Sequence, residues 1–289
     1  IFGNSARYGG GIAISGNVDS PNFTVGRLRV FTTDPARATR IHGNTATQSG
    51  GGIYVSPDAS FFDTSSAQAC LWDVRVDDNH AQQGAALYAD SRSSGTLGQI
   101  AASVHLNALA ADPAFPPSLG FSSCAGRPAG LGAVACAAGV PCNTFDENFA
   151  EDSNGNPSGA VVLVHDDGLL VLRRVSISGS FAQQLVRATA GARVRLHDLL
   201  AAGGNLTGHA ILVDSSQPLV LEDSSIARNF IGAASVIASA GPLAFARNIV
   251  WQPGRRVAQD GAAVTVTTSI VNELTGLPPG PEALVLEPR

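Results

Sequence analysis

The sequence contains no methionine and no lysine, so all 18 of its basic residues are arginines. Charged residues make up only 14% of the chain, and the formal net charge is −5. Without a basic cluster we expect no nucleic-acid partner, because such partners require clustered Lys and Arg to neutralise phosphates. Since no Met opens the chain, we expect a processed or excised piece of a longer protein.

The sequence also lacks several signatures of membrane spans and enzymes. No apolar run reaches the roughly 18 residues of a spanning helix, and no signal peptide is visible. No phosphate-binding loop, nucleophile elbow or metal-binding helix motif is found. The chain is therefore not expected to span a membrane, and it offers no decisive active-site motif.

The cysteines are few and are not arranged as CxxC pairs, so no zinc site is expected. Four cysteines permit three pairings, and their spacing does not choose among them. Disulfides that pin a loop would suit an oxidising compartment. The four residues are Cys70, Cys124, Cys136 and Cys142.

A short repeat organises the first half of the chain. Residues 1–16 and 41–56 both read as an apolar residue, an Asn three positions later, a glycine run and a short alternating strand. Weaker copies begin at Val76, Phe145 and Ile226. A unit too short to bury its own apolar face indicates a stacked solenoid.

The second half repeats a strand pattern with inward residues at positions x, x+2, x+5 and x+7. Alternation by two indicates a strand with one buried face, and the step of three indicates a tight corner between two strands. A third strand follows about ten residues later. The expected inward pairs of that strand are Ile12 and Ile14, Ile53 and Val55, Leu87 and Ala89, Val162 and Val164, Ile211 and Val213, and Val236 and Ala238.

This pattern predicts an all-β fold, a right-handed single-stranded parallel β-helix with three strands per coil and about ten coils. Residues 1–289 would form a single domain. An antiparallel sandwich would need frequent Asn-Gly or Asp-Gly hairpin turns, which are few here. A doubly wound α/β fold would need amphipathic helices between the strands, and the loops are too short and too rich in glycine.

Residues 91–141 interrupt the pattern with Pro, Gly and Ser and hold two of the four cysteines, with Cys142 directly after them. We expect a loop insertion there that projects from the rod, either as a binding element or as a shield. An irregular coil around residues 98–106 could lie inside it.

The recurring glycines and asparagines have a structural interpretation. Glycine permits positive φ and close approach of neighbouring coils. The asparagines are expected to adopt the left-handed region and to hydrogen-bond their stacked neighbours through their side-chain amides. They are Asn4, Asn44, Asn79, Asn148 and Asn229.

The paired FxxN-like and GGxI-like motifs resemble the repeats of polymorphic outer membrane proteins and related autotransporter passenger domains. The motifs stand at Ile1–Asn4, Ile41–Asn44, Val76–Asn79 and Phe145–Asn148, with glycine runs at Gly9–Gly11 and Gly50–Gly52. The resemblance covers about the first 165 residues. It implies a secreted or surface-displayed passenger, associated with a bacterial outer membrane and used for adhesion. No translocator barrel follows in these residues.

A weaker set of candidates concerns catalysis. The segment His165, Asp166, Asp167 offers paired carboxylates that could divide general acid from base or nucleophile, and His209 follows in a Gly-His pair. These residues faintly resemble the Asp-Asp and Gly-His signatures of polygalacturonases. The spacing differs by about one coil, and an Arg-x-Lys element is ruled out by the absence of lysine. The interpretation that competes with catalysis is turn capping by aspartate.

No cofactor is expected, although a row of turn aspartates could hold Ca²⁺. These aspartates fall just after the third strand: Asp58, Asp90, Asp166 and Asp214.

The outward positions of the third strand are unexpectedly apolar, whereas a solvated face would be polar. We expect this face to be covered by the insertion, a neighbouring domain or a ligand. Two tyrosines on adjacent coils could alternatively form a sugar-stacking platform. The predicted binding residues are Tyr54, Tyr88, Leu163, Leu212 and Ile237, with Ala13 in the same row.

Together these features predict a secreted or cell-surface binding module, adhesin-like or a scaffold, without catalysis. Its partner would be a glycan or protein on a host or neighbouring cell, met through an outer face. The alternatives are a pectin-lyase-like enzyme acting on a polysaccharide and a structural spacer.

Overall fold

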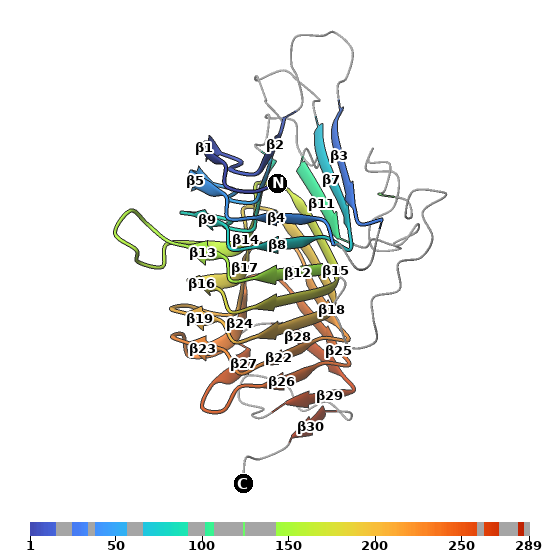
Figure 1. Cartoon of the computed structure of the whole chain (residues 1–289). Helices are drawn as coiled ribbons and strands as arrows, with labels where there is room; N and C mark the ends of the chain where they lie inside the picture. Colours follow the sequence, from blue (N-terminus) through green and yellow to red (C-terminus); the bar gives the residue numbers. More distant parts are fainter. Residues whose placement is uncertain are drawn as a thin grey trace.

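The computed structural model describes residues 1–15, 25–33, 38–56, 66–91, 102–106, 124, 143–258, 263–271 and 283–285. Every regular element in these residues is a β-strand, and the strands form three sheets of fifteen, seven and eight members, which we name A, B and C. Pairing within the sheets is parallel throughout, as in the long β15–β18 pair. Figure 1 shows the strands of successive repeats stacked along one direction from the N-terminal to the C-terminal end.

Sheet A has two limbs. The first limb contains β3 (Val25–Phe31), β7 (Ser66–Trp72), β11 (Ala102–Leu106), β15 (Leu169–Ser178), β18 (Arg193–Ala202), β21 (Leu219–Glu222), β25 (Leu243–Ala246) and β28 (Val264–Thr267). The second limb contains β4 (Arg40–His42), β8 (Arg75–Asp77), β12 (Asn143–Asp146), the distal halves of β15 and β18, β22 (Ser225–Ala227), β26 (Ile249–Trp251), β29 (Ser269–Val271) and β30 (Ala283–Val285).

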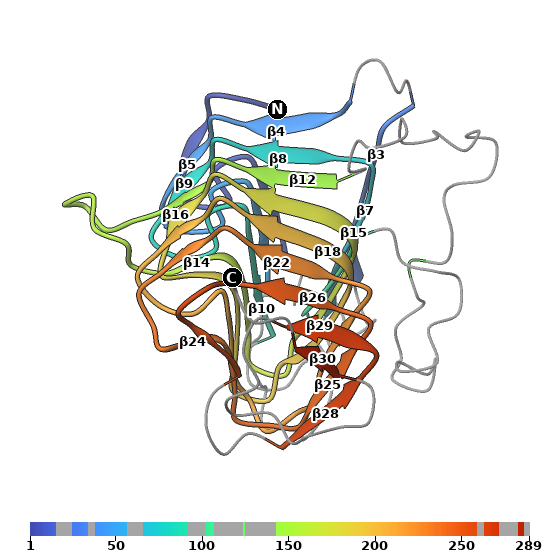
Figure 2. The ribbon, with the colours of Figure 1, turned by 90° about the horizontal axis from the view of Figure 1, so that it is seen from below.

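As far as Ser239, one strand of each of the other two sheets follows sheet A in every repeat. Sheet B contains β1 (Ser5–Tyr8), β5 (Thr45–Ser49), β9 (His80–Ala81), β13 (Phe149–Ala150), β16 (Phe181–Ala182), β19 (Asn205–Leu206) and β23 (Phe230–Ile231). Sheet C contains β2 (Ile12–Ile14), β6 (Ile53–Val55), β10 (Leu87–Asp90), β14 (Ala160–His165), β17 (Gln184–Thr189), β20 (Ile211–Asp214), β24 (Ser235–Ser239) and β27 (Arg256–Ala258). As far as β24 the chain thus passes through the sheets in a fixed cyclic order, whereas after β26 it continues to β27 of sheet C without a sheet B strand (Figures 1 and 2).

The predicted inward residues stack in register. Leu172 pairs with Leu196, Leu196 with Leu221 and Leu221 with Phe245, and each is at most 1% exposed. Burial of such a side chain stabilises the fold by about 1.5–3 kcal/mol. The core column predicted from the x, x+2 spacing is therefore confirmed.

The prediction of strands was incomplete. Three strands were expected per coil. The two that meet at the tight corner form the two limbs of sheet A, and the third belongs to sheet C. Sheet B was not predicted. Most sheet B strands are only two residues long, which is too short to show an alternation. Strand β17 was also missed, because the predicted series of third strands passes from Val162 and Val164 to Ile211 and Val213; the inward residues of β17 are Val186 and Ala188.

Strand β11 lies where an irregular coil was expected inside the predicted insertion at 91–141. Residues Ala102–Leu106 pair with β7 on one side and β15 on the other, and both Val104 and Leu106 are fully buried. The backbone N–H of Ala102 donates to Ser91 Oγ at 3.0 Å. This segment is thus part of the sheet.

The asparagine stack is confirmed for Asn4, Asn44, Asn79 and Asn148, whereas Asn229 donates its side-chain N–H groups to the backbone carbonyl oxygens of Ala201 and Ala227. Asn4, Asn44 and Asn79 each donate a side-chain N–H to the amide oxygen of the next asparagine at 3.0–3.2 Å, and the series ends at Asn148. The asparagines themselves do not have positive φ. The residue before each one does, as at Gly43 (φ 61°) and Asp78 (φ 55°). The strained turn residue and the hydrogen-bonding residue are therefore separate.

Candidate functional site

The strongest cluster of chemically active side chains lies at the end of sheet C. His165 and Asp90 are the last residues of β14 and β10 and are register partners. His165 Nδ1 lies 2.9 Å from Asp166 Oδ2 and 4.0 Å from Asp90 Oδ1. Asp90 is only 5% exposed, whereas the other two side chains are partly exposed. The structure therefore joins two of the predicted catalytic candidates to an aspartate from the preceding repeat.

The other two catalytic candidates take part in different contacts. Asp167 has φ 51° and donates its backbone N–H to the carbonyl oxygen of Ala190 at 2.9 Å. His209 Nδ1 lies 2.8 Å from the carbonyl oxygen of Ser235 in the following repeat. Asp167 thus shapes a turn, and His209 bridges to the neighbouring repeat.

The aspartates considered for calcium do not form one site. Asp214 carries an ion pair with Arg187 at 3.3 Å, and Asp58 lies outside the described residues. Asp90 and Asp166 remain together, but with a histidine between them. Their donor set therefore combines carboxylate oxygens with an imidazole nitrogen.

A second cluster of the same composition lies on sheet A. His197 contacts Asp198 through Nδ1 at 2.9 Å and Asp223 through Nε2 at 3.1 Å. Arg247 also donates two hydrogen bonds to the Asp223 carboxylate, at 2.6 and 2.8 Å. The Arg247 guanidinium lowers the pKa of Asp223, mainly through these hydrogen bonds. In each cluster the ligand atoms of the three residues lie within 4.8 Å of one another, so each could hold a metal ion.

The apolar row on the outer face of sheet C is present but is interrupted. Tyr54, Tyr88 and Leu163 occupy successive register positions, followed by Arg187 and then Leu212. Tyr88 and Leu163 are 8% and 4% exposed although they point away from the main core. Part of this face is therefore already covered within the chain.

The placement of Ile237 in this row was wrong by one residue. Ile237 pairs with the inward Ile211, is fully buried and belongs to the main core cluster. The residue that follows Leu212 in the outer row is Ala238. The segment Ser235–Ser239 has three consecutive apolar residues, so its alternation does not fix the register.

The tyrosines form a ladder that includes Tyr8, which the sequence reading missed. Tyr54 and Tyr88 stack with ring centroids 5.4 Å apart and an interplanar angle of 5°, and Tyr8 lies 5.2 Å from Tyr54. A sugar would stack on a free ring face. Because these rings face each other, a ligand at this ladder would meet mainly ring edges and hydroxyl groups.

A second apolar column was missed entirely. Leu200 and Ile249 are 43% and 45% exposed on the second limb of sheet A, with Ser225 between them in register. The partly exposed Ile270 follows in the same column. These residues occupy the x+6 position of the repeat pattern, so the outward residue of the second strand could have revealed them.

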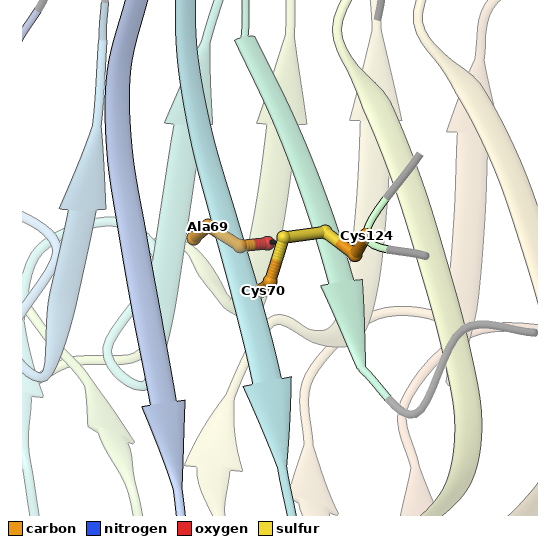
Figure 3. The surroundings of a disulfide bond; sticks show 3 residues. All are labelled: Ala69, Cys70 and Cys124. Atoms are coloured by element: carbon orange, nitrogen blue, oxygen red, sulfur yellow. Dashed lines mark hydrogen bonds between the residues drawn. A yellow bond between two sulfur atoms is a disulfide. The ribbon is translucent and has the colours of Figure 1, made fainter. Parts of the chain in front are cut away.

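A disulfide joins Cys70 of β7 to Cys124 (Figure 3). Both cysteines are at most 2% exposed and pack with Trp72. Cys70 is a register partner of His105, on the outer face of the first limb. The bond therefore anchors a residue of the Cys-containing region to sheet A. Cys136 and Cys142 lie outside the described residues.

Comparisons with protein families, with curated proteins and with solved structures find no match. The resemblance to autotransporter passenger domains therefore rests on the repeat motifs alone. No helix in the described ranges is long and apolar enough to cross a membrane.

Proposed function

We propose that the three sheets form the faces of a right-handed, single-stranded parallel β-helix that serves as a secreted or cell-surface binding module. The fixed cyclic order of the sheets and the in-register parallel pairing support this architecture. A stack of this kind presents long flat faces on which equivalent side chains align at about 4.8 Å intervals.

The exposed Leu200–Ile249–Ile270 column carries the functional proposal. Large aliphatic side chains in register on an outer face are typical of a contact surface, because water solvates them poorly. A column of Leu and Ile offers no ring face for sugar stacking, so we favour a protein partner on a host or neighbouring cell. The role is adhesin-like or that of a scaffold.

The Cys70–Cys124 bond supports an extracellular location, because disulfides persist mainly in oxidising compartments. Association with a bacterial outer membrane follows only from the motif resemblance and remains part of this proposal. A mature secreted chain would retain its disulfide after purification without reductant, which mass spectrometry can test.

The test is a binding assay of the purified chain against immobilised collagen, fibronectin and laminin, a glycan array and intact epithelial cells. We expect saturable binding to a protein or to cells that falls at least about tenfold in the Leu200→Ser/Ile249→Ser double variant. The Leu212→Ser variant, on sheet C, is the matched control and should bind normally. Circular dichroism and thermal melting would establish that all variants fold.

Two results would overturn the proposal. One is equal loss of binding in the Leu212→Ser control, which would move the contact away from sheet A. The other is release of reducing sugars or unsaturated products from a polysaccharide panel, which would identify an enzyme. Binding to glycans alone would favour a different surface and ligand class.

A further inference from the structure

The end of sheet C carries a row of polar residues on four neighbouring strands. Asp90 pairs with His165, Thr189 pairs with Asp214, and the register of β14 with β17 places His165 next to Thr189. Asp166 follows His165 with φ 43°. Potential ligand groups of different chemistry, contributed by four repeats, therefore lie side by side along the end of sheet C.

Two buried atoms in the middle of this row are poorly satisfied. Thr189 Oγ1 makes no hydrogen bond to a described group, and His165 Nδ1 makes none either and has only the Asp166 carboxylate close by. Most buried polar atoms in native proteins have a partner, so such atoms indicate a bound water or ion. The His165 nitrogen also lies between two carboxylates, at 2.9 and 4.0 Å.

These separations suit coordination of a metal. Zinc binds histidine nitrogen and carboxylate oxygen at about 2.0–2.2 Å, so two ligand atoms on one ion lie roughly 3–4 Å apart. The three ligand atoms already lie within 4.8 Å of one another. Small side-chain rotations would bring them into one coordination sphere.

We propose that Asp90, His165 and Asp166 bind a divalent first-row transition-metal ion, with His165 Nδ1 as the nitrogen ligand. A mixed imidazole and carboxylate set favours Zn²⁺ over Ca²⁺, which prefers oxygen ligands alone. The ion would link the ends of β10 and β14 and thus two successive repeats. This site does not depend on the proposed binding function.

The cluster on sheet A provides an internal control. His197, Asp198 and Asp223 have the same donor types, but Arg247 already holds the Asp223 carboxylate with two hydrogen bonds. A metal ion there would have to displace a guanidinium. Within the described residues, Asp166 forms an ion pair with His165 alone.

The test is isothermal titration of Zn²⁺ into the untagged, chelator-treated protein without reductant. The wild-type chain should show a saturable site and a raised melting temperature with Zn²⁺. His165→Gln and the milder Asp166→Asn should each weaken Zn²⁺ binding at least about tenfold. His197→Gln should leave the affinity unchanged, and Ca²⁺ should bind far more weakly.

The proposal fails if the wild-type chain shows no saturable Zn²⁺ binding, since a water then accounts for the two buried atoms. It also fails if His197→Gln removes the binding, or if folded His165→Gln and Asp166→Asn variants retain it. These outcomes are independent of adhesion, which the preceding assay measures separately.

Discussion

The first repeats and the later repeats build the same corners from different residues. Ahead of the buried asparagine position, the first two repeats use Gly3 and Gly43 at positive φ, whereas a later repeat uses Arg228 at φ 56°. Glycine adopts this conformation without strain, and a side chain costs roughly 1–2 kcal/mol there. A repeat with a side chain at this corner therefore accepts strain there and gains a side chain on the outer surface, as at Asp78 and Arg228, whereas Gly179 and Gly203 show that later repeats also use glycine.

The corner between the limbs of sheet A shows what those side chains contribute. Asp198, Asp223 and Arg247 all have positive φ, and their side chains form the ion network around His197. Glycine at these positions would remove the charged groups. The comparison indicates that corners built with charged side chains add ion pairs on the surface, which corners built with glycine cannot form.

The largest effect should come from the buried amide of the early repeats. Asn79 Oδ1 accepts from the backbone and side chain of Asn44, and its Nδ2 donates to Ile41, Asp77 and Asn148. Asn79→Ala leaves several buried groups unpaired and should lower the free energy of unfolding by about 3 kcal/mol. Chemical denaturation would measure the change.

The control for this prediction is Asn205→Ala in β19, where the side chain is exposed. That substitution should change stability by no more than about 0.5 kcal/mol. If both variants unfold alike, the ladder does not hold the early repeats together.

A somewhat smaller loss of stability is expected where a glycine lets two early repeats pack closely against each other. A Cβ at Gly51 would lie 2.6 Å from the carbonyl oxygens of both His80 and Ala85. Gly51→Ala should therefore force the neighbouring repeat apart and cost about 2 kcal/mol. Thermal melting would detect it, and an unchanged melting temperature would contradict the close approach.

The corner substitutions test the comparison most directly. A Cβ at Gly43 would meet only Asp78 Oδ2, at an ordinary contact distance of 3.9 Å, but φ is 61°, so Gly43→Ala should cost about 1 kcal/mol. The reverse change, Arg228→Gly, should alter stability by less than about 0.5 kcal/mol, since relief of strain offsets the added freedom of the unfolded chain. Equal and large losses in both variants would show that the corner type does not matter.

The smallest effect concerns acid sensitivity in the later repeats. The lowered pKa of Asp223 means that the folded chain binds this proton more weakly than the unfolded chain. The resulting stability is present above the ordinary aspartate pKa of about 3.9 and is lost as pH falls through the lowered value. Between about pH 5 and about pH 2, the melting temperature of the Arg247→Gln variant should therefore fall less than that of the wild type. If the melting temperatures of the variant and the wild type fall equally as the pH is lowered, Arg247 does not have this role.

Much of the fold could be predicted because apolar spacing reports directly on burial. The Leu172, Leu196 and Leu221 column and the Asn4–Asn148 ladder both follow from recurrent spacing. Ile237 could not be placed, because consecutive apolar residues permit either register. The pairing of Cys70 with Cys124 was also open, since spacing does not choose among three pairings.

The candidate site was only partly predictable for a different reason. His165 and Asp166 are neighbours in sequence, but Asp90 reaches them through the pairing of β10 with β14. Residues 91–159 separate the two strands in sequence, so no local motif connects them. The exposed Leu200–Ile249–Ile270 column was not predicted, because inward spacing carries no information on the outward x+6 positions and Ser225 interrupts the column.

The asparagine ladder has a direction, since each amide nitrogen from Asn4 to Asn79 donates to the oxygen of the next asparagine along the chain. A ladder of this kind stays continuous only when complete repeats are inserted or deleted. Insertion of one complete repeat would preserve the donor–acceptor links, whereas a partial repeat would leave an amide without its partner. Consecutive ladder asparagines are 40, 35 and 69 residues apart, so the segments between them can differ in length as long as each asparagine returns to the same place in the stack.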